Sequence, residues 1–584
     1  MLTHDYKRNL SVITLLAALV ACGDDAPRAR APRITTTPAA SAPAPGATTA
    51  PGANEAKKSH RDVVVALVVD QFPAWLVDER RSAWPTNGGF ARLAREGRFY
   101  ARVRYEHAVT DTAPGHASLF TGVIPSRSGI VTNETCDAKG TRQSILRDES
   151  AFLIGHGGGT KRVASSLAAL RVDTVADRLR AAHPDAIIVS LSLKDRGTLF
   201  GGGRKPTASL WLDIESATWV TSTAVASASA IAEHEHAPFY AWAPKLDLAT
   251  PWTLLDEAWV KANARGADDA AGEGNFFELG TTFPHVVPNT ENRGRAARAT
   301  PMADAWIVDT ATRALAAYVR PQETSPVFIA MSFSAHDYVA HAYGADSWEA
   351  WDEERRLDAQ LAQWLGVLDR TFGSDGYTLV LSGDHGGIPL PEAKQRDGCD
   401  KDAWQRPCVS GPRVDPLALK TRLEKAVSAK LGPGPWILSI PDPFIWFTDK
   451  GRDAKVRAKV VAEVQRALAK EAWLLSAVDT LAPVKVGDEE MTRLVSASIA
   501  PDTAGAVRTT GDIMLLTKPG AFFENDYTFG KGTNHGTPYL YDRTVPLFIR
   551  APGRIQPGVV VAEPETFRVY ARTITDAFGL PPMQ

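Results

Sequence analysis

Residues 63–69 read V-V-V-A-L-V-V and are followed directly by Asp70. Seven consecutive apolar residues are typical of a strand that is buried on both faces of a sheet. Similar apolar runs occur at 187–193, 327–333, 377–381 and 545–549. These runs predict further buried strands, and together they decide the fold class.

Segments with helix-type periodicity lie at 304–319, 347–371, 416–430 and 453–469. Strands that alternate with helices predict an α/β fold with a mostly parallel central sheet flanked by helices. The stretch 200–300 is rich in Gly, Trp and Pro and lacks this rhythm, so we expect a cap-like insertion there.

The composition excludes several classes of protein. Of the 584 residues, 44% are hydrophobic and 23% are charged, which excludes a wholly disordered or fibrous chain. Lys and Arg number 65 against 67 Asp and Glu, so the chain lacks the basic charge that a nucleic-acid backbone requires. Four cysteines are too few for a disulfide-stapled scaffold. We therefore expect a large globular protein with no nucleic-acid recognition.

The N-terminus is typical of an export signal. Lys7 and Arg8 precede an apolar run at 10–21 that is too short to span a bilayer as a helix. The run ends in L-V-A before Cys22, which resembles a bacterial lipobox. The resemblance implies a lipoprotein signal peptide over 1–21 and a lipid anchor on Cys22. The protein would then be exported and membrane-anchored, facing the periplasm or the cell surface. An ordinary secretory signal with a chance cysteine is the alternative.

A tether follows the expected anchor. Within 26–53, 24 of 28 residues are Ala, Pro, Thr, Gly or Ser. Such a stretch cannot bury a core and stays extended. We therefore expect a disordered anchor and tether over 22–59 and a catalytic body over 60–584.

Six side chains of metal-binding type follow the ends of the predicted strands or lie in a late Gly-rich loop. They are Asp70, Asp337, His341, Asp384, His385 and His535. In open α/β sheets, sites form at the carboxyl edge, so we expect these side chains to gather. Three carboxylates and three imidazoles suit zinc better than magnesium or calcium, which prefer oxygen ligands.

A hydroxyl nucleophile is predicted within 110–119, which reads T-D-T-A-P-G-H-A-S-L. The proline two residues after Thr112, followed by a helical run, indicates the start of a helix. The Thr112 hydroxyl then lies at the positive end of that helix, where an alkoxide or a phosphate is favoured. The alternative is that Thr112 only caps the helix.

Taken together, these segments resemble the alkaline phosphatase superfamily, and their order along the chain matches it. The motifs are Asp70, T-A-P-G-H at 112–116, G-x-x-P-x-x-x-G-I-x-x-N at 122–133, D-Y-x-x-H at 337–341, G-D-H-G at 383–386 and N-H-G at 534–536. S-L-K-D-R-G at 192–197 resembles the threonine-dependent, exported bacterial alkaline phosphatases, which are related to the type I phosphodiesterases and nucleotide pyrophosphatases. The resemblance implies an alkaline-phosphatase-like fold and a phosphoric monoester hydrolase.

The resemblance also implies roles for single residues. One Zn²⁺ would be held by Asp70, Asp384 and His385, with Thr112 as a further metal contact and the activated nucleophile, and a second Zn²⁺ by Asp337, His341 and His535. Asn133, Lys194 and Arg196 would bind the phosphoryl oxygens. The implied reaction hydrolyses small phosphate monoesters to inorganic phosphate through a phosphothreonine intermediate.

Two alternatives stay open. A phosphodiesterase or nucleotide pyrophosphatase would use the same metals and nucleophile, but it should offer an apolar slot for the second ester group. A non-catalytic surface-binding lipoprotein would keep the fold without the chemistry.

The remaining histidines and cysteines have structural interpretations. We expect His116 to support the nucleophile turn and His336 to lie behind the metal site. Cys399 and Cys408 bracket a short loop and are the natural disulfide pair in an oxidising compartment, which leaves Cys136 free.

Overall fold

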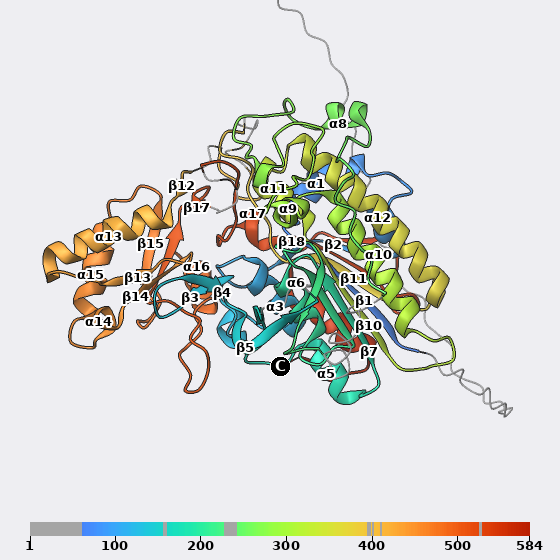
Figure 1. Cartoon of the computed structure of the whole chain (residues 1–584), viewed down its shortest axis with the longest axis horizontal. Helices are drawn as coiled ribbons and strands as arrows, with labels where there is room; N and C mark the ends of the chain where they lie inside the picture. Colours follow the sequence, from blue (N-terminus) through green and yellow to red (C-terminus); the bar gives the residue numbers. More distant parts are fainter. Residues whose placement is uncertain are drawn as a thin grey trace, which may run out of the picture. The chain divides into compact units, whose positions relative to one another are not determined.

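The computed structural model describes residues 61–155, 161–226, 242–393, 399, 402–408, 411–524, 528 and 530–583 (Figure 1). The expected signal peptide, Cys22 and the tether lie outside these residues, so they stay predictions. Among the residues that the structure does describe, no helix is long and apolar enough to cross a membrane.

A mixed sheet of twelve strands forms the centre of the described chain. Its middle consists of five parallel strands, in the spatial order β11 (Thr378–Gly383), β1 (Val63–Val69), β10 (Val327–Phe333), β7 (Ile187–Ser192) and β8 (Ala208–Leu212). Four of these are the apolar runs that the sequence predicts as buried strands. The mostly parallel α/β core is therefore confirmed.

The two edges of the sheet are not purely parallel. β18 (Thr544–Arg550) is the fifth predicted strand, and it pairs antiparallel with β11 and with β2 (Arg98–Arg104). On the other side, β9 (Trp219–Ser222) pairs antiparallel with β8. The outer strands are β19 (Val559–Val561) and β20 (Glu565–Thr566) beside β2, and β5 (Arg147–Ile154) and β6 (Val163–Ser165) beyond β9.

Helices cover both faces of the sheet because alternate residues of each strand point to opposite sides. Val65 and Leu67 of β1 pack into a core shared with α10 (Pro301–Tyr318) and α12 (Trp348–Phe372). Ala66 packs into a second core on the other face. The second core includes residues of α3 (Thr112–Thr121), α5 (Val175–Ala182), α6 (Asp195–Gly202) and α18 (Arg568–Ala577).

The expectation for two helices is corrected by the structure. α13 (Pro416–Leu431) and α15 (Arg457–Leu468) form where predicted, but they do not cover the main sheet. They pack on a separate antiparallel sheet, with the order β13 (Ile437–Ser439), β14 (Phe444–Phe447), β16 (Ile513–Thr517) and β15 (Leu474–Asp479) (Figure 1). Helical periodicity reports an apolar face but not the sheet that it covers.

The stretch 200–300 also differs in part from the expected cap. β8 and β9 lie within it and belong to the main sheet. The described part from 242 onward contains α8 (Glu257–Asn263), η2 (Phe276–Glu278) and α9 (Arg293–Ala297). Its apolar residues, such as Phe276, pack against α11 (Ala335–Tyr343) and α12, so we call 242–300 the covering segment.

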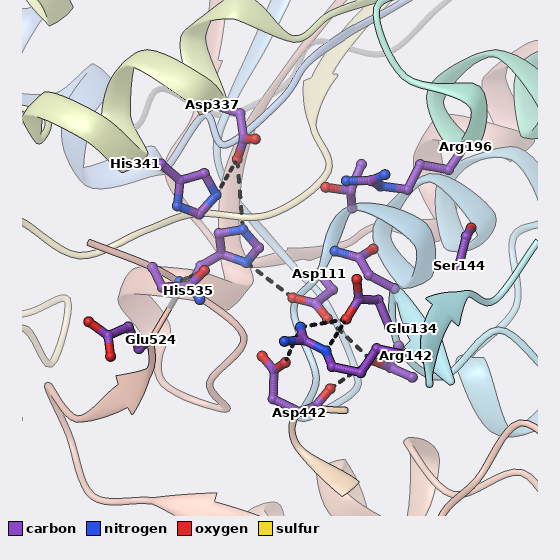
Figure 2. A pocket seen from close by; sticks show the side chains of 14 residues that line it. Asp111, Glu134, Arg142, Ser144, Arg196, Asp337, His341, Asp442, Glu524 and His535 are labelled. Carbon is purple, nitrogen blue, oxygen red and sulfur yellow. Dashed lines mark hydrogen bonds and ion pairs between the residues drawn. The ribbon is translucent and has the colours of Figure 1, made fainter. Parts of the chain in front are cut away.

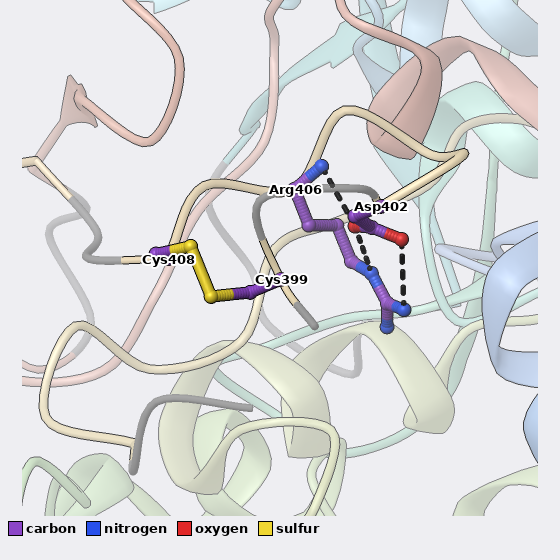
Figure 3. The surroundings of a disulfide bond; sticks show 4 residues. All are labelled: Cys399, Asp402, Arg406 and Cys408. Carbon is purple, nitrogen blue, oxygen red and sulfur yellow. Dashed lines mark hydrogen bonds and ion pairs between the residues drawn. A yellow bond between two sulfur atoms is a disulfide. The ribbon is translucent and has the colours of Figure 1, made fainter. Parts of the chain in front are cut away.

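A disulfide bond joins Cys399 and Cys408, the pair that the sequence suggests (Figure 3). Between them, Arg406 pairs with Asp402 and reaches Glu79 of α1 (Ala74–Arg80) through Nη2 at 2.8 Å. The described part of this loop is thereby fastened to the first helix after β1. The other described elements are η1 (Arg81–Ala83), α2 (Gly89–Glu96), α4 (Pro125–Ser128), β3 (Glu134–Cys136), β4 (Arg142–Ser144), β12 (Arg413–Val414), α14 (Asp449–Arg452), α16 (Glu489–Ala497), β17 (Phe522–Phe523) and α17 (Leu540–Arg543).

Candidate active site

The metal-binding residues predicted from the sequence meet at the carboxyl edge of the main sheet. Asp70 follows β1, Asp384 and His385 follow β11, and α11 begins just after β10 and carries Asp337 and His341. His535 arrives from the loop that precedes α17. All six side chains are buried. Because β1, β10 and β11 are parallel neighbours, their ends necessarily lie side by side.

Asp70, Asp384 and His385 form one group whose ligand atoms all lie within 4.8 Å of one another. His385 Nε2 lies 3.4 Å from Asp70 Oδ1 and 3.6 Å from Asp384 Oδ2. Both oxygens of Asp70 and Asp384 Oδ2 are buried, and Asp384 Oδ2 also lies 3.0 Å from His116 Nδ1.

A second group surrounds Asp337 (Figure 2). Asp337 Oδ1 lies 3.2 Å from His341 Nε2 and 3.7 Å from His535 Nε2. His385 also lies within 4.8 Å of Asp337 and His535, and the His385 and His535 rings stack at 3.8 Å between centroids. His385 therefore belongs to both groups.

The three histidines are oriented in the same way. Nδ1 of His385 lies 2.9 Å from the Gly386 carbonyl, Nδ1 of His341 lies 2.8 Å from Thr533 O, and Nδ1 of His535 lies 2.9 Å from Thr110 O. A carbonyl only accepts, so each Nδ1 donates and each neutral ring keeps its Nε2 lone pair toward the carboxylates. This is the arrangement of metal-binding histidines, and together with the three buried carboxylates it fits a pair of metal ions.

The same carboxylates attract protonated groups. Burial opposes charge on His385, but Asp384 and Asp70 outweigh it and raise the pKa of His385 to about 10. The Lys194 ammonium lies 2.8 Å from Asp70 Oδ2 and 2.5 Å from Asp337 Oδ2. Burial would raise the pKa of Asp70, yet Lys194 holds that pKa below its usual range. The cluster is therefore a strong cation site.

Thr112 is the first residue of α3, and Asp111, not Thr112, occupies the N-cap position. The Thr112 hydroxyl lies 3.4 Å from His385 Nε2 and 3.4 Å from Lys194 Nζ. α3 approaches the end of β11 so closely that a Cβ at Gly115 would lie 2.2 Å from Asp384 O. The glycine of T-A-P-G-H thus lets the helix start sit against the metal ligands.

Asn133 and Arg196 line the pocket that opens in front of Thr112. Asn133 Oδ1 accepts a hydrogen bond of 2.7 Å from the Ala113 N–H at the helix start. The NH₂ end of the same amide therefore points away from the helix start. On the outer side, Arg142 pairs with Glu134 at 2.5 Å and lies 3.6 Å from Asp442, which is in the loop between β13 and β14 (Figure 2). Among the lining residues that the structure describes, the only rings are the imidazoles of His341 and His535, and none is Phe, Trp, Tyr or aliphatic.

His116 and His336, which the sequence analysis interprets as structural, both contact groups that support the site. His116 contacts the Thr112 carbonyl through Nδ1 at 3.0 Å and Ser332 Oγ through Nε2 at 2.9 Å. His336 Nδ1 lies 3.1 Å from the Asp70 carbonyl, behind the site.

Sequence reasoning missed two carboxylates that support the site. Asp111 Oδ1 lies 3.3 Å from His535 Nδ1. Asp304 accepts hydrogen bonds from Ser334 N and Ala335 N at the start of α11, the helix of Asp337. Asp111 could have been predicted from the sequence, because it directly precedes Thr112. Asp304 lies far from the ligands in sequence and gave none.

Comparison with known proteins identifies the family. The model of the type I phosphodiesterase / nucleotide pyrophosphatase family matches residues 64–538, which is most of the chain. The chain belongs to this family. The expected membership of the alkaline phosphatase superfamily is thereby confirmed, and the protein is a hydrolase of that superfamily.

Several relatives are alkaline phosphatases by name. The chain is 28% identical over 502 residues to alkaline phosphatase PhoK of a Sphingomonas species, with 83% of each chain covered. It is 27% identical over 510 residues to alkaline phosphatase PhoV of Synechococcus elongatus, covering 85% of this chain and 86% of the relative. The crystal structure of wild-type alkaline phosphatase PafA shares the fold, with a TM-score of 0.72 and 24% identity, over 90% of this chain and 96% of PafA.

Proposed function

We propose that the protein is an alkaline phosphomonoesterase that forms a phosphothreonine intermediate on Thr112 at a two-zinc site. Family membership supports phosphoester hydrolysis, and the mixed carboxylate and imidazole cluster supports zinc. The observation that carries the proposal is the Thr112 hydroxyl, which lies at a helix start beside that cluster and opens into a polar pocket.

The residues divide naturally between two ions. Asp70, Asp384 and His385 would hold one, and Asp337, His341 and His535 would hold the other. When bound, zinc supplies Lewis-acid stabilisation of phosphoryl oxygens and makes a hydroxyl group easier to deprotonate. His385 lies within reach of both groups, so each ion would affect the other's ligands.

The chain's own residues then carry the reaction. The helix start stabilises negative charge on Thr112 Oγ1, which attacks phosphorus while the bond to the alcohol breaks. Lys194 and Arg196 compensate the phosphoryl charge, and the Asn133 amide donates to a phosphoryl oxygen. Water then attacks the phosphothreonine, the Oγ1–P bond breaks, and inorganic phosphate leaves.

The lining of the pocket favours monoesters over diesters. A diester places a second organic group near the metal site, and an apolar or aromatic wall would bind that group well. The described lining offers carboxylates, guanidinium groups, hydroxyls and amides instead. Lys194 and Arg196 also match the second negative charge of a monoester, which a diester lacks.

The deciding experiment compares a phosphate monoester and a diester of the same leaving group on the zinc-loaded protein. We expect the monoester to have the higher kcat/KM. A higher kcat/KM for the diester would instead support the phosphodiesterase alternative, and no hydrolysis of either would support the non-catalytic alternative.

We also propose that the protein is exported and anchored to a membrane through lipid on Cys22, facing the periplasm or the cell surface. The support is the lipobox-like L-V-A-C at 19–22 and the Ala- and Pro-rich tether after it. The disulfide between Cys399 and Cys408 agrees with an oxidising compartment.

A further inference from the structure

Lys194 needs support from its surroundings if it is to select substrates. Its side chain is long and flexible, yet its ammonium group lies near three oxygens of the site, on Asp70, Asp337 and Thr112. These oxygens belong to metal ligands and to the nucleophile, so they have other roles in the reaction. A neighbouring side chain that takes no part in the reaction is better suited to hold the Lys194 ammonium group in one position.

Tyr338 is such a neighbour. It follows Asp337 on α11, and its side chain is buried. Lys194 Nζ lies over its ring, 4.8 Å from the ring centroid. An ammonium group within about 6 Å of an aromatic centroid is attracted to the negative face of the ring. The ring therefore favours one position of the ammonium group without competing for a hydrogen bond.

The covering segment holds Tyr338 in turn. Arg298 Nη1 donates a hydrogen bond of 2.7 Å to the Tyr338 hydroxyl, and its guanidinium carbon lies 4.4 Å from the ring centroid. Phe276 lies against the same ring at 5.7 Å between centroids. Arg298 is buried, and its Nε finds no hydrogen-bond partner within the part of the chain that the structure describes. Its hydrogen bond to Tyr338 is thus a main polar contact of this cation.

We propose that Tyr338 is a positioning residue for Lys194, held by Arg298 and Phe276, and that the covering segment thereby contributes to the preference for monoesters. The part concerning substrate preference rests on the proposed function. The part concerning the position of Lys194 does not, so the two can fail separately.

Two substitutions of Tyr338 and a matched control test the idea. Tyr338→Leu removes the ring, whereas Tyr338→Phe keeps the ring and removes only the hydroxyl. Tyr343→Leu is the control, because Tyr343 is buried on the same helix and its hydroxyl bonds to Gly280 of the covering segment at 2.9 Å. It changes the same contact between helix and segment without touching Lys194.

The first readout is the reactivity of Lys194 in the protein as purified, measured by reductive methylation and peptide mass spectrometry. We expect Tyr338→Leu to raise the labelling rate of Lys194 at least about fivefold, because the ammonium group loses its aromatic support. Tyr343→Leu should stay within about twofold of wild type, since it leaves Tyr338 unchanged. Tyr338→Phe should fall between the control and Tyr338→Leu, because it keeps the ring but loses the hydrogen bond from Arg298. The exposed Lys205 serves as the internal standard.

The second readout is the ratio of monoester to diester kcat/KM in zinc-loaded enzyme with zinc content measured. We expect this ratio to fall at least about fivefold in Tyr338→Leu and to be unchanged in Tyr343→Leu. Equal effects of the two leucine substitutions on both readouts would overturn the proposal, because they would indicate general damage. Labelling that changes while the ratio does not would overturn only the role in substrate preference.

Arg298→Gln keeps the test decisive if Tyr338→Leu does not fold. It leaves Tyr338 in place but removes its guanidinium partner, and we expect Lys194 labelling to rise about threefold. Labelling at the wild-type rate in Arg298→Gln would show that the covering segment does not act on the lysine.

Discussion

At the scale of single residues, the chemistry of the site depends on the positions of its charged groups and on the direction of the histidine lone pairs. The three histidine Nε2 atoms converge on carboxylates because each Nδ1 is engaged by a backbone carbonyl. Lys194, at the N-cap of α6, pairs with two of the same carboxylates, Asp70 and Asp337. Substitutions here should therefore separate nucleophile, metal and charge effects.

Thr112→Ala should keep its metal and lose activity by at least about a thousandfold, because it removes the attacking oxygen and no ligand of the cluster. Phosphate release and zinc content are measured on the same sample. Ser118→Ala, a hydroxyl within the same helix, is the control. Turnover near wild type in Thr112→Ala would mean that another residue is the nucleophile.

Asp337→Ala and His535→Ala should each lower zinc content by about one equivalent, because a zinc site rarely survives the loss of one of three protein ligands. A chelator should abolish activity, and zinc should restore it better than magnesium. His336→Ala is the control, since His336 bonds to the Asp70 carbonyl and contributes no ligand. Full zinc occupancy in both ligand variants would contradict the assignment.

Lys194→Ala should lower monoester kcat/KM at least about tenfold and diester kcat/KM much less, because a charge-assisted contact is worth roughly 1.5–3 kcal/mol. Metal content should not fall, since the substitution removes a cation that pairs with Asp70 and Asp337. Lys205→Ala, on the surface, is the matched control. An unchanged monoester-to-diester ratio would show that Lys194 does not select the substrate.

At the scale of elements, close backbone approaches govern how the helices meet. A Cβ at Gly386 would lie 2.1 Å from Tyr541 O, so the G-D-H-G turn can pack under α17 only with glycine there. α12 packs as tightly against the start of α2, where Asp358 Oδ1 accepts a 2.7 Å hydrogen bond from Phe90 N. The first contact fixes the turn that carries Asp384 and His385, and the second fixes α12 against α2.

Asp358 makes the contact between α12 and α2 dependent on pH. Burial raises the pKa of Asp358 to about 6, although the Phe90 N–H lowers it. The native state then binds more protons than the unfolded state between about pH 4 and 6, so the free energy of unfolding falls as pH rises through this window and is level above it. The change amounts to about 3 kcal/mol at most.

Asp358→Asn should remove this dependence while its side-chain oxygen still accepts from Phe90 N. Compared with wild type, the variant should gain stability above about pH 6 and lose that advantage near pH 4. Denaturant unfolding from pH 4 to 8 measures the difference. Parallel pH profiles for the two proteins would show that folding does not raise the pKa of Asp358.

At the scale of the whole molecule, the pocket is assembled from segments that are distant in sequence. Asp442 comes from the loop between β13 and β14 of the small antiparallel sheet. Glu134 and Arg142 come from the hairpin of β3 and β4, and His535 comes from a late loop. The small sheet therefore contributes a wall of the pocket although it has its own core.

We expect the proposed anchor and tether to affect location and not catalysis, because the family match begins at residue 64. Cys22→Ala should move the protein from the membrane fraction to the soluble fraction and leave kcat/KM within about twofold, because a single lipid anchor adds membrane affinity only. Fractionation and metabolic labelling with a fatty acid measure this. Retention of Cys22→Ala in the membrane would contradict lipidation at this position.

Sequence by itself determined the buried strands, the identity of the candidate ligands and the family resemblance. Strands such as 63–69 are legible because burial on both faces requires an unbroken apolar run. The candidate ligands can be predicted because residues such as Asp70 and Asp384 directly follow such strands, and the carboxyl ends of parallel strands lie at one edge of the sheet. The candidate nucleophile can be predicted because Pro114 indicates a nearby helix start, and α3 does begin at Thr112.

Only the tertiary structure decided which elements meet. Helical periodicity at 416–430 could not reveal that α13 covers a separate antiparallel sheet, because an amphipathic face does not specify its partner. Nor could it show that Asp304 caps α11, or that Arg298 holds Tyr338 against Lys194. These contacts join residues far apart in sequence, and long-range contacts arise from the packing of the whole chain and leave no local pattern.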